Sequence, residues 1–166
     1  CIDFSAMPGL AIENAVLNNM SIISAHTNLD KASMGLNDHF AKLLEIINTR
    51  PLVQDFGDDE YQNSMMGIGR IGRFKKGILL HDLVKKIKNK LNINKMRISG
   101  KPEAVLKTVA ICTGSGGSLI KNFLDSDADV YITGDTKYHE ARLVEEFHRS
   151  LIDVGHFASE HIVVNL

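Results

Sequence analysis

The chain has 166 residues, of which 44% are hydrophobic, enough to build a core in one domain or in two small ones. Its 19 basic and 20 acidic residues give a net charge of −1, which does not favour a protein that works by bulk attraction to nucleic acid or to an anionic membrane. No apolar run approaches the ~20 residues that a membrane-spanning helix needs. Two cysteines, Cys1 and Cys112, form no disulfide framework, so we expect a soluble protein of the reducing cytoplasm.

The N-terminal third predicts a helix, a strand and a second helix. Apolar residues on one side of residues 11–18 indicate a short helix, and residues 21–26 are typical of a largely buried strand. Asn37 or Asp38 can cap a helix that runs to about residue 47. Residues 51–64 are acidic and polar without periodicity, so we expect a loop there with at most one short strand.

Gly67, Gly69 and Gly72 have the G-x-G-x-x-G spacing of a dinucleotide fingerprint. No strong buried strand precedes them, and the residues that follow do not begin a helix, so the fingerprint lacks its structural context. We interpret this stretch as a twisted strand or as a crossover between domains.

Residues 79–91 form the clearest predicted helix, because their apolar residues repeat along one face. Between residues 85 and 101 lie seven basic residues and no acidic one. The simplest interpretation is the solvated face of that helix, followed by an edge strand at residues 95–98 that is protected by its charge. The alternative is a patch for phosphate-bearing ligands or nucleic acid.

The second half predicts strands that alternate with helices. Residues 109–112 read as a buried strand, in which Cys112 is a small buried hydrophobe rather than a reactive thiol. A glycine loop follows, and Ser118 can cap a helix that runs to Asp125. Three further elements complete the pattern: a strand at residues 130–133, a helix at residues 138–148 and a strand at residues 151–154.

This alternation predicts an α/β fold with mainly parallel or mixed sheet. Two small domains fit the pattern better than one doubly wound sheet. We expect a first α/β domain at residues 1–66, whose N-terminal part is missing, and a second at residues 67–150. Residues 151–166 would return to the first domain, and the chain is expected to be truncated at both ends.

Polar side chains gather where the predicted strands end, which is where open α/β sheets place their functional groups. The set consists of His26 and Asp30, the glycine loop (Gly114, Gly116, Gly117, Ser118), Asp135 with His139, and His156 with Glu160. Each has a structural alternative: His26 as a core histidine, Asp30 as a turn residue, Asp135 as a helix cap, and the loop as a tight turn. The loop is no Walker motif, yet a strand followed by glycines and a helix start can present N–H groups to an anion.

His156 and Glu160 lie four residues apart, so on a helix their side chains share one face, with Cβ atoms roughly 6 Å apart. An imidazole and a carboxylate in this arrangement can bind one divalent cation. Alone, such a pair is weak evidence. Together with His26 and Asp30, it indicates a convergent site of oxygen and nitrogen donors.

Four blocks in order, residues 24–30, 111–118, 133–139 and 153–160, resemble the Nif-three-like family, whose members are often labelled GTP cyclohydrolase I type 2 homologues. The resemblance covers nearly the whole chain. It implies a two-domain α/β protein that forms a ring-shaped homohexamer with a dinuclear metal centre facing the interior. The small domain that some members insert between the two halves has no room here.

By this resemblance, Asp30, His156 and Glu160 fall on metal-ligand positions, and His26 and His139 line the same pocket, with Asp135 nearby. The family's further ligands come from a His-His-Pro motif ahead of the first block, which this sequence does not contain. The full-length protein would therefore hold two divalent ions (Zn, Mn or Fe), and this chain one or none.

The donor set suits metal-dependent hydrolysis, with Glu160 or His26 as general acid or base. The family label makes the substrate a nucleotide, whose phosphates the glycine loop and the basic patch could contact. The competing interpretation is a non-catalytic metal-binding protein, such as a metallochaperone or a scaffold. Nucleic-acid binding through residues 85–101 is the least favoured.

Overall fold

A computed structural model describes residues 2–55 and 66–165 of the protein. The described strands form one six-stranded sheet in the order β1-β2-β4-β5-β6-β3. They are β1 (Ile46–Gln54), β2 (Gly67–Leu79), β3 (Arg97–Ser99), β4 (Val105–Ser115), β5 (Val130–Gly134) and β6 (Ser150–Asp153). The helices are α1 (Gly9–Leu17), α2 (Thr27–Lys31), α3 (Leu36–Leu43), α4 (Leu80–Leu91), α5 (Ile120–Asp125), α6 (Tyr138–Glu146) and α7 (His156–Glu160), with short 3-10 turns at η1 (Gly117–Leu119) and η2 (His161–Asn165).

Strands β4, β5 and β6 are parallel to one another. Residues 109–114 of β4 and all residues of β5 and β6 are buried on both faces, as expected for short runs rich in Val, Ile and Ala. Strands β1, β2 and β3 add to this unit in antiparallel fashion. The carboxyl ends of β4, β5 and β6 therefore open at one edge of the sheet, and β3 begins there.

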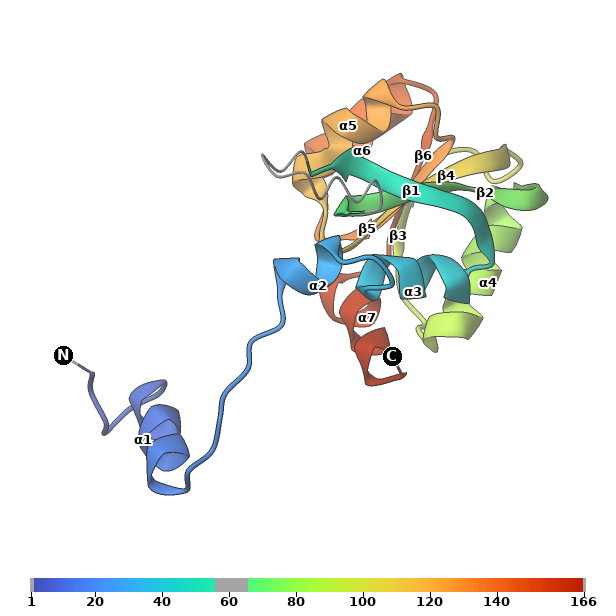
Figure 1. Cartoon of the computed structure of the whole chain (residues 1–166). Helices are drawn as coiled ribbons and strands as arrows, with labels where there is room; N and C mark the ends of the chain where they lie inside the picture. Colours follow the sequence, from blue (N-terminus) through green and yellow to red (C-terminus); the bar gives the residue numbers. More distant parts are fainter. Residues whose placement is uncertain (1, 56–65, 166) are drawn as a thin grey trace.

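Helices cover both faces of the sheet (Figure 1). Alternate residues of β4 separate two cores: Val109 and Ile111 pack with residues of α3 and α4, whereas Ala110 and Cys112 pack with residues of α5 and α6. This mixed α/β architecture confirms the predicted fold class. The sheet runs across the expected boundary at residue 67, and the division into two domains stays a prediction.

Several predicted elements are confirmed. Helix α4 and the strands β5 and β6 appear within a residue or two of their predicted limits, Gly67–Gly72 lies in a strand, and β3 is an edge strand. The helix predicted to reach residue 47 ends at Leu43, because the chain turns at Glu45 (φ 61°) into β1. The expected loop at residues 51–64 is strand as far as Gln54, and residues 56–64 lie outside the described residues.

The predicted buried strand at residues 21–26 is wrong. These residues are exposed and have no regular secondary structure, and Ile23 is 90% accessible to solvent. The apolar sequence indicates burial, but no described strand pairs with this segment. It connects α1, which stands apart from the rest of the molecule, to α2 (Figure 1).

A fully buried arginine joins β2 to α3 and to the residue that follows α2. Arg70 donates from Nε and Nη2 to the two carboxylate oxygens of Asp38, at 2.7 and 2.9 Å. The same guanidinium also donates to the carbonyl oxygens of Gly67, Gly69 and Ala32. Burying a charged arginine is costly unless its N–H groups are paired in this way. Because the partners come from α3 and from the end of α2, this network fixes both helices against the sheet.

Replacing Arg70 with Met should lower the free energy of unfolding by about 3–5 kcal/mol, because Asp38 and three carbonyl oxygens would lose their donor. Chemical denaturation measures the change. Arg73→Met is the matched control: Arg73 lies on the same strand with its side chain 65% exposed, and should change stability by less than about 0.5 kcal/mol. Equal effects of the two substitutions would contradict this role for Arg70.

No helix in the described part of the chain is both long and apolar enough to cross a membrane.

Candidate functional site

The carboxyl ends of β4, β5 and β6 bring three distant segments together. Ser115 of β4 lies opposite Gly134 of β5, and Thr133 of β5 lies opposite Asp153 of β6. Asp135 therefore follows β5 beside the loop that leads from β6 into α7. The parallel register alone places these residues at one edge of the sheet.

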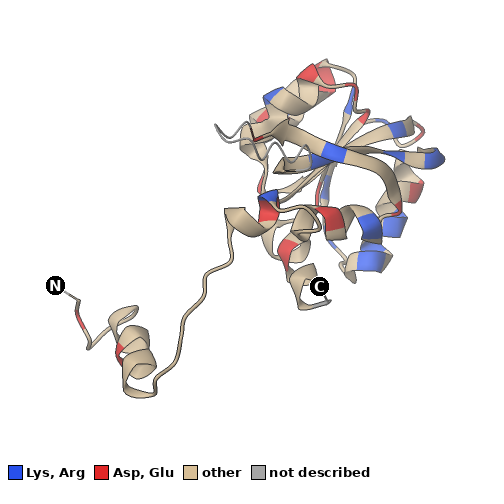
Figure 2. Cartoon of the chain, viewed as in Figure 1, with Lys and Arg blue, Asp and Glu red and all other residues tan. Residues whose placement is uncertain are grey.

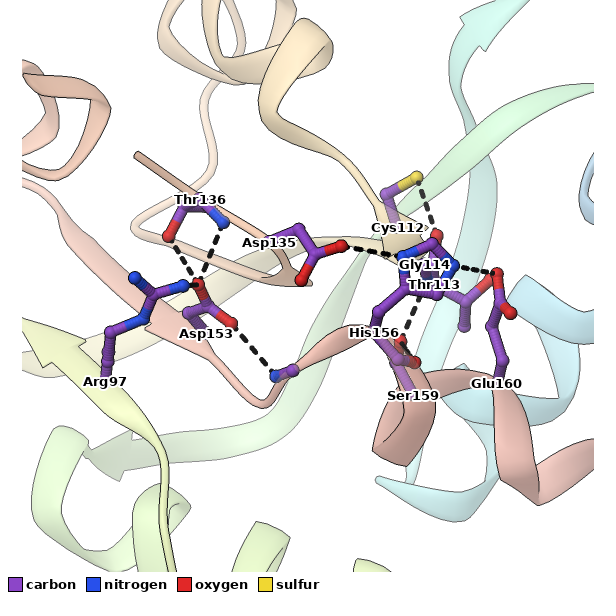
Figure 3. A network of polar contacts seen from close by, with 11 residues as sticks. Arg97, Cys112, Thr113, Gly114, Asp135, Thr136, Asp153, His156, Ser159 and Glu160 are labelled. Carbon is purple, nitrogen blue, oxygen red and sulfur yellow. Dashed lines mark hydrogen bonds and ion pairs between the residues drawn. The ribbon is translucent and has the colours of Figure 1, made fainter. Parts of the chain in front are cut away.

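His156 is held between two carboxylates (Figure 3). Its Nδ1 lies 2.8 Å from Oδ2 of Asp135, and its Nε2 lies 3.0 Å from Oε1 of Glu160 on the next turn of α7. The hydrogen bond with Asp135 is the largest cause that raises the pKa of His156, and the charge of Glu160 raises it further against the opposing effect of burial. Asp135 thus determines how the ring is turned, and its helix-cap alternative fails because the N-cap of α6 is Lys137.

Asp30 and His26 reach the same site from α2 and the segment before it. They line a small cavity of about 100 Å³ together with Glu160. Burial raises the pKa of Asp30, the nearby charge of Glu160 adds to this, and a hydrogen bond from Thr113 Oγ1 at 3.3 Å opposes it. The structure therefore places His26, Asp30, His156 and Glu160 in one neighbourhood, as the sequence indicates. The His26 side chain is exposed, and among the described residues its ring hydrogen-bonds only to Thr27 Oγ1, at 2.9 Å.

Gly114 and Ser159 fix α7 against β4. A Cβ at Gly114, whose φ is 68°, would lie 2.4 Å from Oε1 of Glu160, so any other residue would displace that carboxylate and strain the backbone. The Gly114 N–H donates to the buried Ser159 hydroxyl at 2.8 Å, and that hydroxyl donates to the His156 carbonyl. Gly114 thus serves the site by close packing, as one alternative for the loop supposes.

The rest of the predicted loop lies elsewhere. Gly116 packs against Tyr131 and Thr133, and a Cβ at Gly117 would lie 2.9 Å from the carboxylate of Glu140. A carboxylate at that distance repels a second anion, and the N-cap of α5 is Leu119 and not the predicted Ser118. Anion binding by this loop stays a prediction.

The sequence also singled out His139 and Cys112. His139 is exposed at the start of α6, and among the described residues no hydrogen bond or ion pair joins it to His156, Asp135 or Glu160. Cys112 is buried, and burial raises the pKa of its thiol to about 12, in agreement with a structural role.

Sequence reasoning missed the residue that organises this edge, Asp153. The carboxylate is 2% exposed, and its Oδ2 accepts hydrogen bonds from the N–H of Thr136 at 2.9 Å, the Oγ1 of Thr136 at 2.6 Å and Nη2 of Arg97 at 2.6 Å. Its Oδ1 accepts the N–H of Gly155 at 2.9 Å (Figure 3). Thr136 follows Asp135 and Gly155 precedes His156, so Asp153 positions the two residues that hydrogen-bond to each other. The available signal is a carboxylate at the end of a buried strand, where a turn residue needs no charge.

Four of the seven basic residues of the predicted patch lie on α4, Arg97 begins β3, and Lys95 and Lys101 lie just before and after β3 (Figure 2). The lysines of α4 are on its solvent side, opposite its buried residues Leu80, Leu83 and Ile87, as the simpler interpretation expects. A cavity of about 820 Å³ lies between α3, α4, β1 and β2, and His156 does not line it. Nucleic-acid binding by this patch stays a prediction.

The protein is of the α/β class: a mixed sheet covered by helices, with a histidine and carboxylate cluster at the ends of its parallel strands. The sequence matches the family described as Duf34/NIF3 (NGG1p interacting factor 3) over residues 2–166, and the chain belongs to that family. The resemblance seen in the sequence is thereby confirmed.

Individual relatives agree with this assignment. A GTP cyclohydrolase 1 type 2 homolog of Clostridium perfringens (strain 13 / Type A) is 32% identical over 152 residues, which cover 92% of this chain and 56% of the relative. A protein of the same name from Campylobacter jejuni subsp. jejuni is 36% identical over 153 residues, covering 92% and 55%. The crystal structure of Staphylococcus aureus hypothetical protein SA1388 superposes with a TM-score of 0.83 at 25% identity, covering 99% of this chain and 67% of that one. The chain thus spans about half the length of the curated relatives it matches.

Asp153→Asn should destabilise the protein by roughly 2–3 kcal/mol at neutral pH, because an amide cannot accept all four hydrogen bonds. Burial alone would raise the pKa of Asp153, but the hydrogen bonds from Thr136 and Gly155 and the charge of Arg97 lower it overall. A lowered pKa stabilises the fold above the unfolded value of 3.8, and this contribution is lost as the pH falls through the folded-state pKa.

Urea titrations of both proteins at a series of pH values should therefore show a difference that is largest near neutrality and shrinks in acid. Asp127→Asn, at an exposed carboxylate 4.0 Å from its partner, is the control and should change little. A stability difference between the two proteins that does not depend on pH would show that Asp153 does not act as an ionised carboxylate.

Proposed function

We propose that this protein binds divalent metal through Asp30, His156 and Glu160 and acts as a metal-dependent hydrolase. The observation that carries the proposal is the geometry of His156: Asp135 holds one ring nitrogen, and the other lies 3.0 Å from Glu160 beside a cavity that Asp30 and His26 also line. A carboxylate that orients the outer nitrogen of a histidine is the usual support of a metal ligand.

The donors fit such a metal in kind. Two carboxylates and an imidazole suit Zn, Mn or Fe and not soft thiolate-bound metals. Within residues 2–55 and 66–165, however, no group of three or more His, Cys, Asp or Glu side chains is closely enough grouped to hold an ion. We therefore propose that two ions bind only when ligands beyond these three complete the site, and that this chain alone holds one or none.

Each residue has a distinct task in the proposed site. Asp30, His156 and Glu160 bind the ion, and Asp135 keeps the Nε2 of His156 facing Glu160. A bound divalent ion would supply an activated water by lowering its pKa toward neutrality. Glu160 or His26 then accepts or donates a proton, and the exposure of His26 lets it exchange that proton with solvent.

A nucleotide substrate and a homohexameric assembly complete the proposal. The substrate class is supported by the name that relatives carry, GTP cyclohydrolase 1 type 2 homolog. We propose the hexamer by the resemblance to the family, and sedimentation of the full-length protein tests it.

The metal content of the full-length protein tests the ligand assignment. Elemental analysis after gel filtration should give about two ions per chain, as two-metal hydrolases hold. His156→Ala and Asp30→Ala should each reduce this content by half or more. His148→Asn is the control, since His148 lies outside the cluster and asparagine tolerates its φ of 56°. Unchanged metal in both ligand variants would overturn the assignment.

Asp135→Ala should weaken metal affinity by about 10–100-fold without removing a ligand, because His156 would lose the group that orients its ring. Competition with a chelator measures the affinity. Asp135→Asn can still hydrogen-bond to the ring and should lie between the alanine variant and the wild type. Wild-type affinity in the alanine variant would show that Asp135 does not position His156.

The alternative is a non-catalytic metal-binding protein, and the incomplete donor set of the described residues favours it. Metal-loaded protein incubated with a panel of nucleotides and phosphoesters separates the two functions. Turnover that His156→Ala abolishes supports the hydrolase. Metal binding without turnover of any compound supports the binding protein.

A further inference from the structure

Beside the His156 cluster lies a second cavity, of about 250 Å³. It is lined by Lys95, Met96, Arg97, Asp153, Val154 and Gly155. The cavity opens where β3 begins and β6 ends, since Arg97 pairs in register with Asp153. Gly155 connects it directly to His156, and Thr136 beside Asp153 connects it to Asp135.

The charges around this cavity are unbalanced. Arg97 and Lys95 bring two cations, and Asp153 is the one carboxylate in the lining. Both oxygens of Asp153 are already engaged, by Thr136, Gly155 and Arg97. Lys95 forms no ion pair among the described residues. The negative charge thus points inward, and the cavity presents positive charge to solvent.

Arg97 is anchored and yet available. One nitrogen, Nη2, donates to Asp153 at 2.6 Å, while the side chain remains 69% exposed. Anchoring at one nitrogen lowers the rotamer entropy that a free arginine loses on binding. The remaining N–H groups of the planar guanidinium keep the fork that matches an oxyanion with two acceptor oxygens.

We propose that this cavity binds the phosphate group of a small-molecule ligand, with Arg97 as the principal donor and Lys95 as the second cation. Figure 3 shows Arg97 on one side of Asp135 and His156 on the other. A phosphate at Arg97 therefore places the body of the ligand across Asp135, toward His156 and Glu160. This position for a phosphorylated substrate rests on the proposed function, whereas phosphate binding by the cavity does not.

The test uses metal-free protein and inorganic phosphate, followed by ³¹P NMR line broadening or calorimetry. Arg97→Gln should weaken phosphate binding about tenfold or more, because a charge-assisted hydrogen bond is lost. Arg97→Lys, which keeps the charge but not the fork, should fall between Arg97→Gln and the wild type. Lys95→Gln should weaken binding severalfold while leaving the Asp153 anchor intact, so it remains informative if Arg97→Gln fails to fold.

Arg73→Gln is the matched control, since Arg73 is a strand arginine of similar exposure that lies 4.0 Å from a carboxylate, Asp127. It should bind phosphate like the wild type. Absence of phosphate binding by the wild type, wild-type affinity in both Arg97→Gln and Lys95→Gln, or equal weakening by Arg73→Gln would each overturn the proposal. Metal content measured on the same variants should stay unchanged, so that failure of the phosphate site is distinguished from failure of the metal site.

Discussion

The Asp153 carboxylate is the constraint on which the candidate site depends. Parallel strands bring their carboxyl ends to one edge, but the loops that follow β5 and β6 are free to diverge unless something joins them. Asp153 joins them by accepting from Thr136 of one loop and Gly155 of the other. Asp135 and His156 are the neighbours of these two residues, so their hydrogen bond follows from the backbone that Asp153 holds. The same carboxylate anchors Arg97, which places the proposed phosphate cavity beside the proposed metal site.

The sequence carries much of this arrangement. Buried strands that alternate with helices predict the parallel unit β4-β5-β6, and polar residues at strand ends predict the cluster. The spacing of four between His156 and Glu160 predicts their contact. What it does not carry is the choice of distant partners. Arg97 and Asp153 are 56 residues apart, and Arg70 and Asp38 are 32 apart, so only the register of the sheet and the packing of α3 bring each pair together. The predicted strand at residues 21–26 is wrong for a related reason. Its apolar composition indicates burial, but composition does not show which strand it would pair with.

Net charge proved to be a coarse guide. The value of −1 hides a separation, because residues 70–107 contain twelve of the 19 basic residues and two of the 20 acidic ones. Long-range attraction depends on such local excess and not on the sum. Most of these cations lie on α4 and β2, and none of these lines the cavity beside Asp30 and Glu160 (Figure 2). Arg97 and Lys95 differ from them in lying at the edge of the sheet where a ligand of His156 would also lie.

The walls of the proposed site are not equally fixed. Glu160 and His156 are set by the fold itself, because Gly114, Ser159 and Asp135 hold α7 and the imidazole without help from a ligand. Asp30 is tied to the body through its carbonyl, which accepts from the buried Asn37, and through Thr113. The His26 side chain, by contrast, is exposed, and among the described residues its ring hydrogen-bonds only to the adjacent Thr27. Side chains that the fold already holds in place bind a metal ion at little conformational cost, whereas ordering His26 would lower the affinity for the ion. Metal affinity should therefore be determined mainly by His156, Glu160 and Asp30. His26 is better suited to exchanging protons than to holding the ion.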